Sequence, residues 1–72
     1  MLKNRRLEVI PEETMDNSFV VGNSEITFAK VYKVNSKWCC WYTKKHLMKY
    51  FNKLKEALAD VNEQWGKFIA IY

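Results

Sequence analysis

The chain has 72 residues, of which 49% are hydrophobic and 15% aromatic, with two glycines and one proline. A chain of this size forms one small domain with a marginal core, because it buries only about 60% of the surface that its unfolded form exposes. The composition is too apolar for a disordered segment and too poor in glycine and proline for a linker. Twelve basic residues against eight acidic ones give a net charge of +4, which favours an acidic partner.

We expect a soluble, cytoplasmic chain that does not enter a membrane. The basic residues near the N-terminus are followed by Glu8 and Pro11, and not by the apolar segment of a signal peptide. No uninterrupted apolar run exceeds five residues, which is too short for a membrane span. Cys39 and Cys40 are adjacent, which excludes a disulfide framework and a Cys-x-x-Cys motif. They are expected to act as two small apolar residues in a reducing compartment.

The first half of the chain predicts short strands separated by turns. Pro11 ends the first strand, and the polar residues 12–18 form a loop or one helical turn. Gly22-Asn23-Ser24 and Asn35-Ser36-Lys37 have the composition of turns. The intervening segments are rich in β-branched and aromatic side chains, as strands are. The expected strands are residues 7–10, 19–21, 26–34 and 38–42, so that residues 19–42 form a three-stranded antiparallel meander.

An amphipathic helix is expected after the meander. Its apolar stripe, with alternating spacings of four and three, consists of Leu47, Phe51, Leu54, Leu58, Val61 and Trp65. Two interpretations fit. One is a helix over residues 44–65 capped by Thr43. The other is a fourth strand of the meander over residues 46–51, before a shorter helix capped by Asn52. The unbroken stripe favours the long helix. Gly66 is then expected to end it, and residues 67–72 to form a last strand.

These elements predict an α+β domain over residues 1–72, with residues 1–6 as a basic N-terminal tail. Its small antiparallel sheet consists of the meander plus short N- and C-terminal strands, and the long C-terminal helix packs on one face. Alternation places Trp38, Cys40 and Tyr42 on one face of their strand, and Cys39 and Trp41 on the other. Because a single helix covers one face only, we expect aromatic surface to remain exposed.

The charges are segregated along the chain. Residues 7–25 carry a net charge of −5, whereas residues 26–55 contain eight lysines and no acidic residue. On the long helix, Lys45, Lys49 and Lys53 lie four residues apart and form a basic ridge. These cations would oppose the helix dipole, which indicates that they bind an anion. The alternative is that the acidic segment folds back onto the lysines and neutralises them.

The sequence predicts no catalytic residue, metal site or cofactor. His46 is the only histidine, and it has no carboxylate or cysteine at metal-ligand spacing. No Gly-x-Ser-x-Gly motif is present, and the isolated Gly22 and Gly66 form no phosphate-binding loop. We therefore expect a binding module and not an enzyme.

The chain resembles known proteins in two respects, one carried by a segment in its middle and the other by its composition. Residues 31–38 (VYKVNSKW) followed by residues 51–57 (FNKLKEA) resemble the layout of small β-sheet DNA-binding modules, such as the arm-binding domains of tyrosine integrases. The resemblance covers about half of the chain and implies DNA binding through the sheet. Lys53 stands where those domains usually have a threonine. A lone, basic, aromatic-rich domain also looks like the accessory proteins of phages and mobile elements, many of which bind and inhibit a host protein.

The leading hypothesis is nucleic-acid binding with low sequence specificity. In it the phosphates are contacted by Lys30, Lys33, Lys37, Lys44, Lys45, Lys49 and Lys53, and the bases stack on Trp38, Trp41 or Tyr42. Specificity is expected to be low because arginine, which makes the commonest bidentate contacts with guanine, is absent from this segment. The alternative is a protein–protein interaction module that binds an acidic protein surface through its aromatic residues, either as an inhibitor or as a homodimer.

Overall fold

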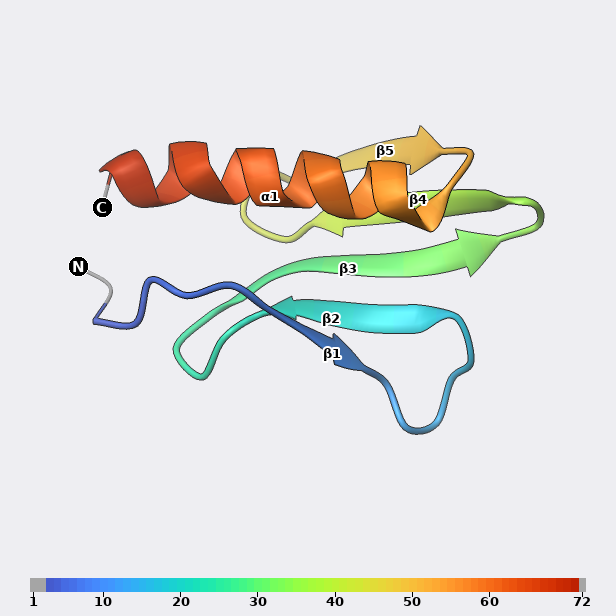
Figure 1. Cartoon of the computed structure of the whole chain (residues 1–72), viewed down its shortest axis with the longest axis horizontal. Helices are drawn as coiled ribbons and strands as arrows, with labels where there is room; N and C mark the ends of the chain where they lie inside the picture. The colour runs from blue at the N-terminus through green and yellow to red at the C-terminus, as the bar shows by residue number, and fades with distance from the viewer. Residues whose placement is uncertain (1–2, 72) are drawn as a thin grey trace.

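The computed structural model describes residues 3–71, in which five strands form one antiparallel sheet with a single helix against it (Figure 1). The elements are β1 (Glu8–Pro11), β2 (Ser18–Gly22), β3 (Thr27–Val34), β4 (Lys37–Tyr42), β5 (Leu47–Phe51) and α1 (Leu54–Ile71). Each strand pairs with the next one along the chain, so the sheet order is β1-β2-β3-β4-β5. The predicted α+β class, the antiparallel meander and the single helix on one face are confirmed.

A bulge at the start of β3 brings two consecutive residues into the core. Val21 pairs with Ala29 but Gly22 pairs with Thr27, so Phe28 is an extra residue on β3. A bulge of this kind bends the strand and turns a side chain that alternation would place on the other face. Phe28 and Ala29 are both buried as a result.

The Phe28 ring lies at the centre of an aromatic cluster that joins the sheet to the helix. Its centroid is 5.2 Å from that of Trp65, 5.3 Å from that of Phe68 and 5.8 Å from that of Tyr42. Such pairs contribute about 0.5–1.5 kcal/mol each beyond the burial of their area. The cluster therefore fixes α1 over β3 and β4.

The predicted long helix is wrong, because residues 47–51 form strand β5. Leu47 pairs with Tyr42 on β4, and Phe51 pairs with Trp38. A spacing of four places two residues on the same side of a strand as well as on the same side of a helix. The start of the apolar stripe therefore fits both elements, and pairing with β4 decides for the strand.

The alternative of a fourth strand followed by a shorter helix is correct, but the cap is Lys53 and not Asn52. The Lys53 backbone N–H donates to Glu56 Oε1 at 3.2 Å, which is the reciprocal half of a capping box. The Asn52 side-chain oxygen instead accepts a hydrogen bond from Lys37 Nζ at 2.8 Å. The basic ridge of Lys45, Lys49 and Lys53 is consequently absent, because these residues lie in a turn, in β5 and at the helix cap.

The predicted C-terminal strand is also wrong, because α1 continues through Gly66 to Ile71; residue 72 lies outside the described residues. Phe68 extends the apolar stripe three residues beyond Trp65 and packs on the same aromatic cluster. The Trp65 Nε1 donates to the Arg5 carbonyl at 3.0 Å, and the Arg5 guanidinium donates to the Ile69 carbonyl. Arg5 of the predicted basic tail therefore lies against the end of the helix.

The two glycines provide a test of the continuous helix at Gly66 and of the close backbone approach at Gly22. Gly66 lies inside α1 with open space around it, so Gly66→Ala should raise the free energy of unfolding by about 0.5–1 kcal/mol. A Cβ at Gly22 would lie 2.2 Å from the Ile26 carbonyl oxygen, so Gly22→Ala should lower it. Urea denaturation of the two variants measures both effects. A loss of stability in Gly66→Ala would contradict the continuous helix.

Candidate interaction surface

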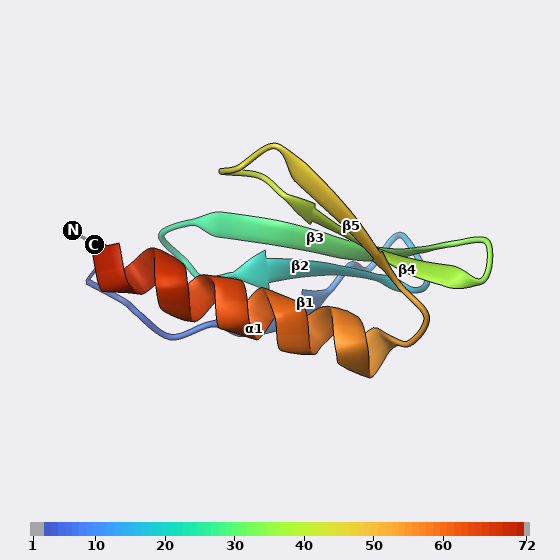
Figure 2. The ribbon, with the colours of Figure 1, turned by 90° about the horizontal axis from the view of Figure 1, so that it is seen from above.

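Helix α1 packs on one face of the sheet and leaves the other face uncovered (Figure 2). The Cys40 thiol lies 3.6 Å from the Ala57 carbonyl oxygen of α1, and the Tyr42 hydroxyl donates to Asp60 of α1. Because side chains alternate along a strand, Cys39 and Trp41 of β4 point away from the helix. The residues that pair with Cys39 and Trp41 on β3 and β5 lie on the same side of the sheet. We call this side the open face. It carries Lys30, Tyr32, Cys39, Trp41, Met48 and Tyr50.

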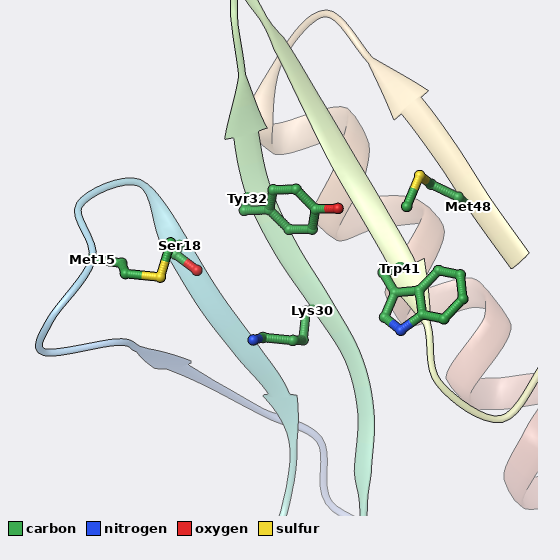
Figure 3. Close-up of a pocket in the computed structure, with 6 residues that line it drawn as sticks. All are labelled: Met15, Ser18, Lys30, Tyr32, Trp41 and Met48. Atoms are coloured by element: carbon green, nitrogen blue, oxygen red, sulfur yellow. The ribbon is translucent and has the colours of Figure 1, made fainter. Parts of the chain in front are cut away.

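The open face contains a hollow of about 380 Å³ (Figure 3). This volume lies within the range of about 300–1,000 Å³ that is common for binding pockets. Two methionines flank it, Met15 from the loop between β1 and β2 and Met48 from β5. The complete lining is Met15, Ser18, Lys30, Tyr32, Trp41 and Met48. Apolar and aromatic groups thus dominate the hollow, and methionine side chains adapt to the shape of an apolar ligand.

The polar groups of the hollow are already paired with one another. Glu12 Oε1 accepts a hydrogen bond from Ser18 Oγ at 2.7 Å and lies 3.6 Å from Lys30 Nζ. A hydrogen bond with Cys39 raises the pKa of Tyr32, with desolvation as the second cause. The one cation that lines the hollow therefore has a carboxylate partner within the chain.

The open face also exposes apolar side chains around the hollow. Met15 is 55% exposed, Met48 is 40% exposed and Tyr50 is 58% exposed. Four residues of this surface are not among the site residues that the sequence predicts: Met15, Tyr32, Met48 and Tyr50. The alternation of Leu47 to Phe51 would have indicated Met48 and Tyr50 if this segment had been assigned as a strand. Met15 lies in a loop and has no such signal.

The lysines predicted to bind phosphates lie on both sides of the sheet. Lys30 and Lys37 belong to the open face, whereas Lys33 and Lys49 belong to the face that carries α1. Lys45 Nζ donates to Gln64 Oε1 of α1 at 2.9 Å, Lys44 is exposed in the same turn, and Lys53 caps the helix. The seven residues therefore do not form one continuous patch, and their role in binding phosphates stays a prediction.

Two ion pairs neutralise lysines of the basic segment. Lys30 pairs with Glu12 of the acidic segment, and Lys49 Nζ lies 3.3 Å from Asp60 Oδ1 of α1. The acidic segment, residues 7–25, therefore neutralises only one lysine of residues 26–55, which is Lys30. Within residues 3–71, the other six lysines of residues 26–55 have no carboxylate partner: Lys33, Lys37, Lys44, Lys45, Lys53 and Lys55.

The three aromatic residues predicted to stack on bases have different environments. Tyr42 is 1% exposed in the core, so its predicted stacking role is wrong. Trp38 is half-buried on the α1 side of the sheet, where its ring centroid lies 6.2 Å from that of Phe19. Trp41 is half-buried on the open face and lines the hollow. Of the three, only Trp41 belongs to the candidate surface.

Residues 3–71 contain no cluster of three or more histidine, cysteine or acidic side chains that could hold a metal ion. No helix within this range has the length and apolarity that crossing a membrane requires. Cys39 and Cys40 are free and buried. Comparison of the chain with known protein families, characterised proteins and solved structures finds no match. Neither of the two resemblances suggested by the sequence is therefore supported by a matching family.

The buried groups behind the hollow predict a loss of stability at alkaline pH. Burial raises the pKa of Cys40 from its ordinary value of 9.0 to about 12. Burial, followed by the hydrogen bond to Asp60, also raises the pKa of Tyr42. Because both pKa values are higher in the folded chain, the stabilisation is complete below about pH 9 and is lost as the pH rises toward 12.

Urea denaturation under reducing conditions, between about pH 8 and pH 11, should therefore show a falling free energy of unfolding. Cys40→Ala removes one of the two groups and should make this dependence on pH less steep. A profile that is flat above pH 9 would contradict the burial of both groups.

Proposed function

We infer that the protein is a non-enzymatic binding module that buries the open face of its sheet against another protein. The observation that carries this proposal is the apolar hollow on the face that the helix leaves uncovered. Trp41 and Tyr32 are residue types that dominate the binding energy of protein interfaces, and they lie at the centre of this surface. We place the protein in the cytoplasm, where its two cysteines remain thiols.

The charge of the hollow favours a protein over a nucleic acid as the ligand. A nucleic acid needs cations that neutralise its phosphates. Lys30 is the one cation in the lining, and Glu12 beside it would repel a phosphate. An apolar protein segment needs no such cation. It would fill the hollow with hydrophobic contacts and leave the pair of Lys30 and Glu12 intact.

Neighbouring residues of β5 supply a matched pair of variants for testing this surface. Met48 is 40% exposed on the open face, and Leu47 is 39% exposed on the α1 side of the same strand. In an affinity capture from nuclease-treated lysate of the cells that contain the protein, Met48→Asp should reduce the retained protein by about tenfold or more. The reason is that a buried, unpaired carboxylate costs more than about 1.4 kcal/mol.

Leu47→Asp introduces the same charge at almost the same exposure and should retain the wild-type amount. Equal retention by both variants would show that the open face is not the binding surface. Circular dichroism spectra and urea midpoints of the two variants establish that each is folded.

Nucleic-acid binding remains a second candidate function, which the six lysines without a carboxylate partner favour. If all six contact phosphates, affinity for a single-stranded oligonucleotide should fall roughly 300-fold between about 50 and 200 mM salt. Fluorescence anisotropy of labelled oligothymidylate measures this dependence. Absence of binding at the lower salt concentration would exclude this candidate.

A further inference from the structure

We propose that the open face binds a second copy of this chain, as a two-fold symmetric dimer in which two sheets pack face to face. This inference rests on the proposed function, since it names the protein that covers the same surface. Three features carry it: the charges at the borders of the open face, the ends of the sheet at which they lie, and the apolar hollow between them.

The exposed charges of β1 and of the loop that follows it are opposite in sign to those at the start of β4 and in the turn that follows β4. On the β1 side, Glu8 begins β1, and Glu13 and Asp16 lie in the loop that follows it. On the β4–β5 side, Lys37 begins β4 and Lys44 lies in the turn before β5. All five residues are exposed, and none has an ion-pair partner within residues 3–71.

These charges also lie at matching ends of the sheet. The loop between β1 and β2 is at the same end of the sheet as the start of β4 (Figure 1). The Lys33 backbone N–H of β3 donates to the carbonyl of Asn17 in this loop at 3.0 Å, and Lys33 pairs with Trp38 near the start of β4. Glu8 is at the other end, because it pairs with Gly22, and Gly22 pairs with Thr27 at the start of β3. The turn between β4 and β5 lies at this end too, since Ala29 of β3 pairs with Tyr42, the last residue of β4. Each acidic group thus has a lysine at the same end of the strands, on the opposite side of the sheet.

A two-fold axis parallel to the strands, in the plane between two open faces, brings these groups together. It places β1 of one copy over β5 of the other and keeps the ends of the sheets aligned. Glu13 and Asp16 of each copy then face Lys37 of the second copy, and Glu8 faces Lys44 of the second copy. An axis perpendicular to the strands would instead place β1 over β1, and acidic groups over acidic groups. Only the first arrangement is complementary in charge.

The apolar groups follow the same symmetry. Met15 lies on the acidic side of the hollow and Met48 on the basic side (Figure 3). In the parallel-axis dimer, Met15 of each copy lies over the β4–β5 side of the second copy, near Met48 and Trp41. Two sheets that pack face to face align within about 30°, with their side chains interdigitating. Because the interface is self-complementary, each contact occurs twice and the assembly closes at two chains.

The first experiment is sedimentation equilibrium of the complete chain from about 1 μM to about 1 mM, a range that covers weak and moderate association. The wild type should approach twice the 8.6 kDa mass of the chain. Met48→Asp should remain monomeric throughout, and Leu47→Asp should associate like the wild type. A wild type that stays monomeric at every concentration overturns the proposal. So does a dimer that Met48→Asp leaves intact.

The second experiment tests the arrangement by exchanging charges. The Glu13→Lys/Asp16→Lys variant and the Lys37→Glu variant should each dimerise more weakly than the wild type, because like charges then face each other. A mixture of the two variants should form a heterodimer, in which each altered side meets a complementary one. Lys55→Glu, on α1 and distant from the open face, is the charge-matched control for Lys37→Glu and should not form this heterodimer. A mixture that stays as weakly associated as its components overturns the parallel axis.

Failure of this proposal is distinguishable from failure of the proposed function. A monomeric chain that still captures a protein in a Met48-dependent manner overturns the dimer and leaves the open face as a binding surface for a different protein. A monomeric chain that captures no protein overturns both. Binding of oligothymidylate that Met48→Asp abolishes and Leu47→Asp does not would assign the open face to nucleic acid, and would also overturn both.

Discussion

The structure depends on one constraint: a single helix packs against a sheet that is apolar on both faces. Helix α1 covers the side where Phe28, Cys40 and Tyr42 meet Ala57, Val61 and Trp65. The chain has no second helix within residues 3–71 to cover the other side, so Tyr32, Trp41 and Met48 line an open hollow there. A chain this small stabilises itself by burying apolar area, and the open face is apolar area that α1 leaves uncovered.

Electrostatics distinguishes the two faces as clearly as packing does. On the covered face, Asp60 accepts a hydrogen bond from Tyr42 and pairs with Lys49, so the charges at the helix contact are satisfied within the chain. On the open face, the pair of Lys30 and Glu12 leaves the hollow without a free cation, and the unpaired charges lie at its borders. This distribution fits a partner that is apolar at the centre and charged at its rim, as protein interfaces are.

The sequence predicted the elements whose signals are local. Strands β3 and β4 follow from their β-branched and aromatic composition, and Asn35 in the turn between them has the positive φ of 58° that asparagine tolerates. The sequence did not predict the start of the helix, because the spacing from Leu47 to Phe51 suits a strand and a helix equally. The end of the helix was misplaced because Gly66 resembles a cap, whereas packing of Phe68 on Phe28 continues the helix beyond it.

By itself the sequence determined that one small α+β domain would have more aromatic surface than one helix can hide, and that its charges would be segregated along the chain. Both conclusions depend only on composition and on the two-residue periodicity of strands. Only the tertiary structure decided that Tyr42 is in the core, that Met15 and Met48 flank the same hollow, and that the lysines divide between two faces. These facts depend on strand pairing and on the position of α1, which are contacts between residues that are distant along the chain.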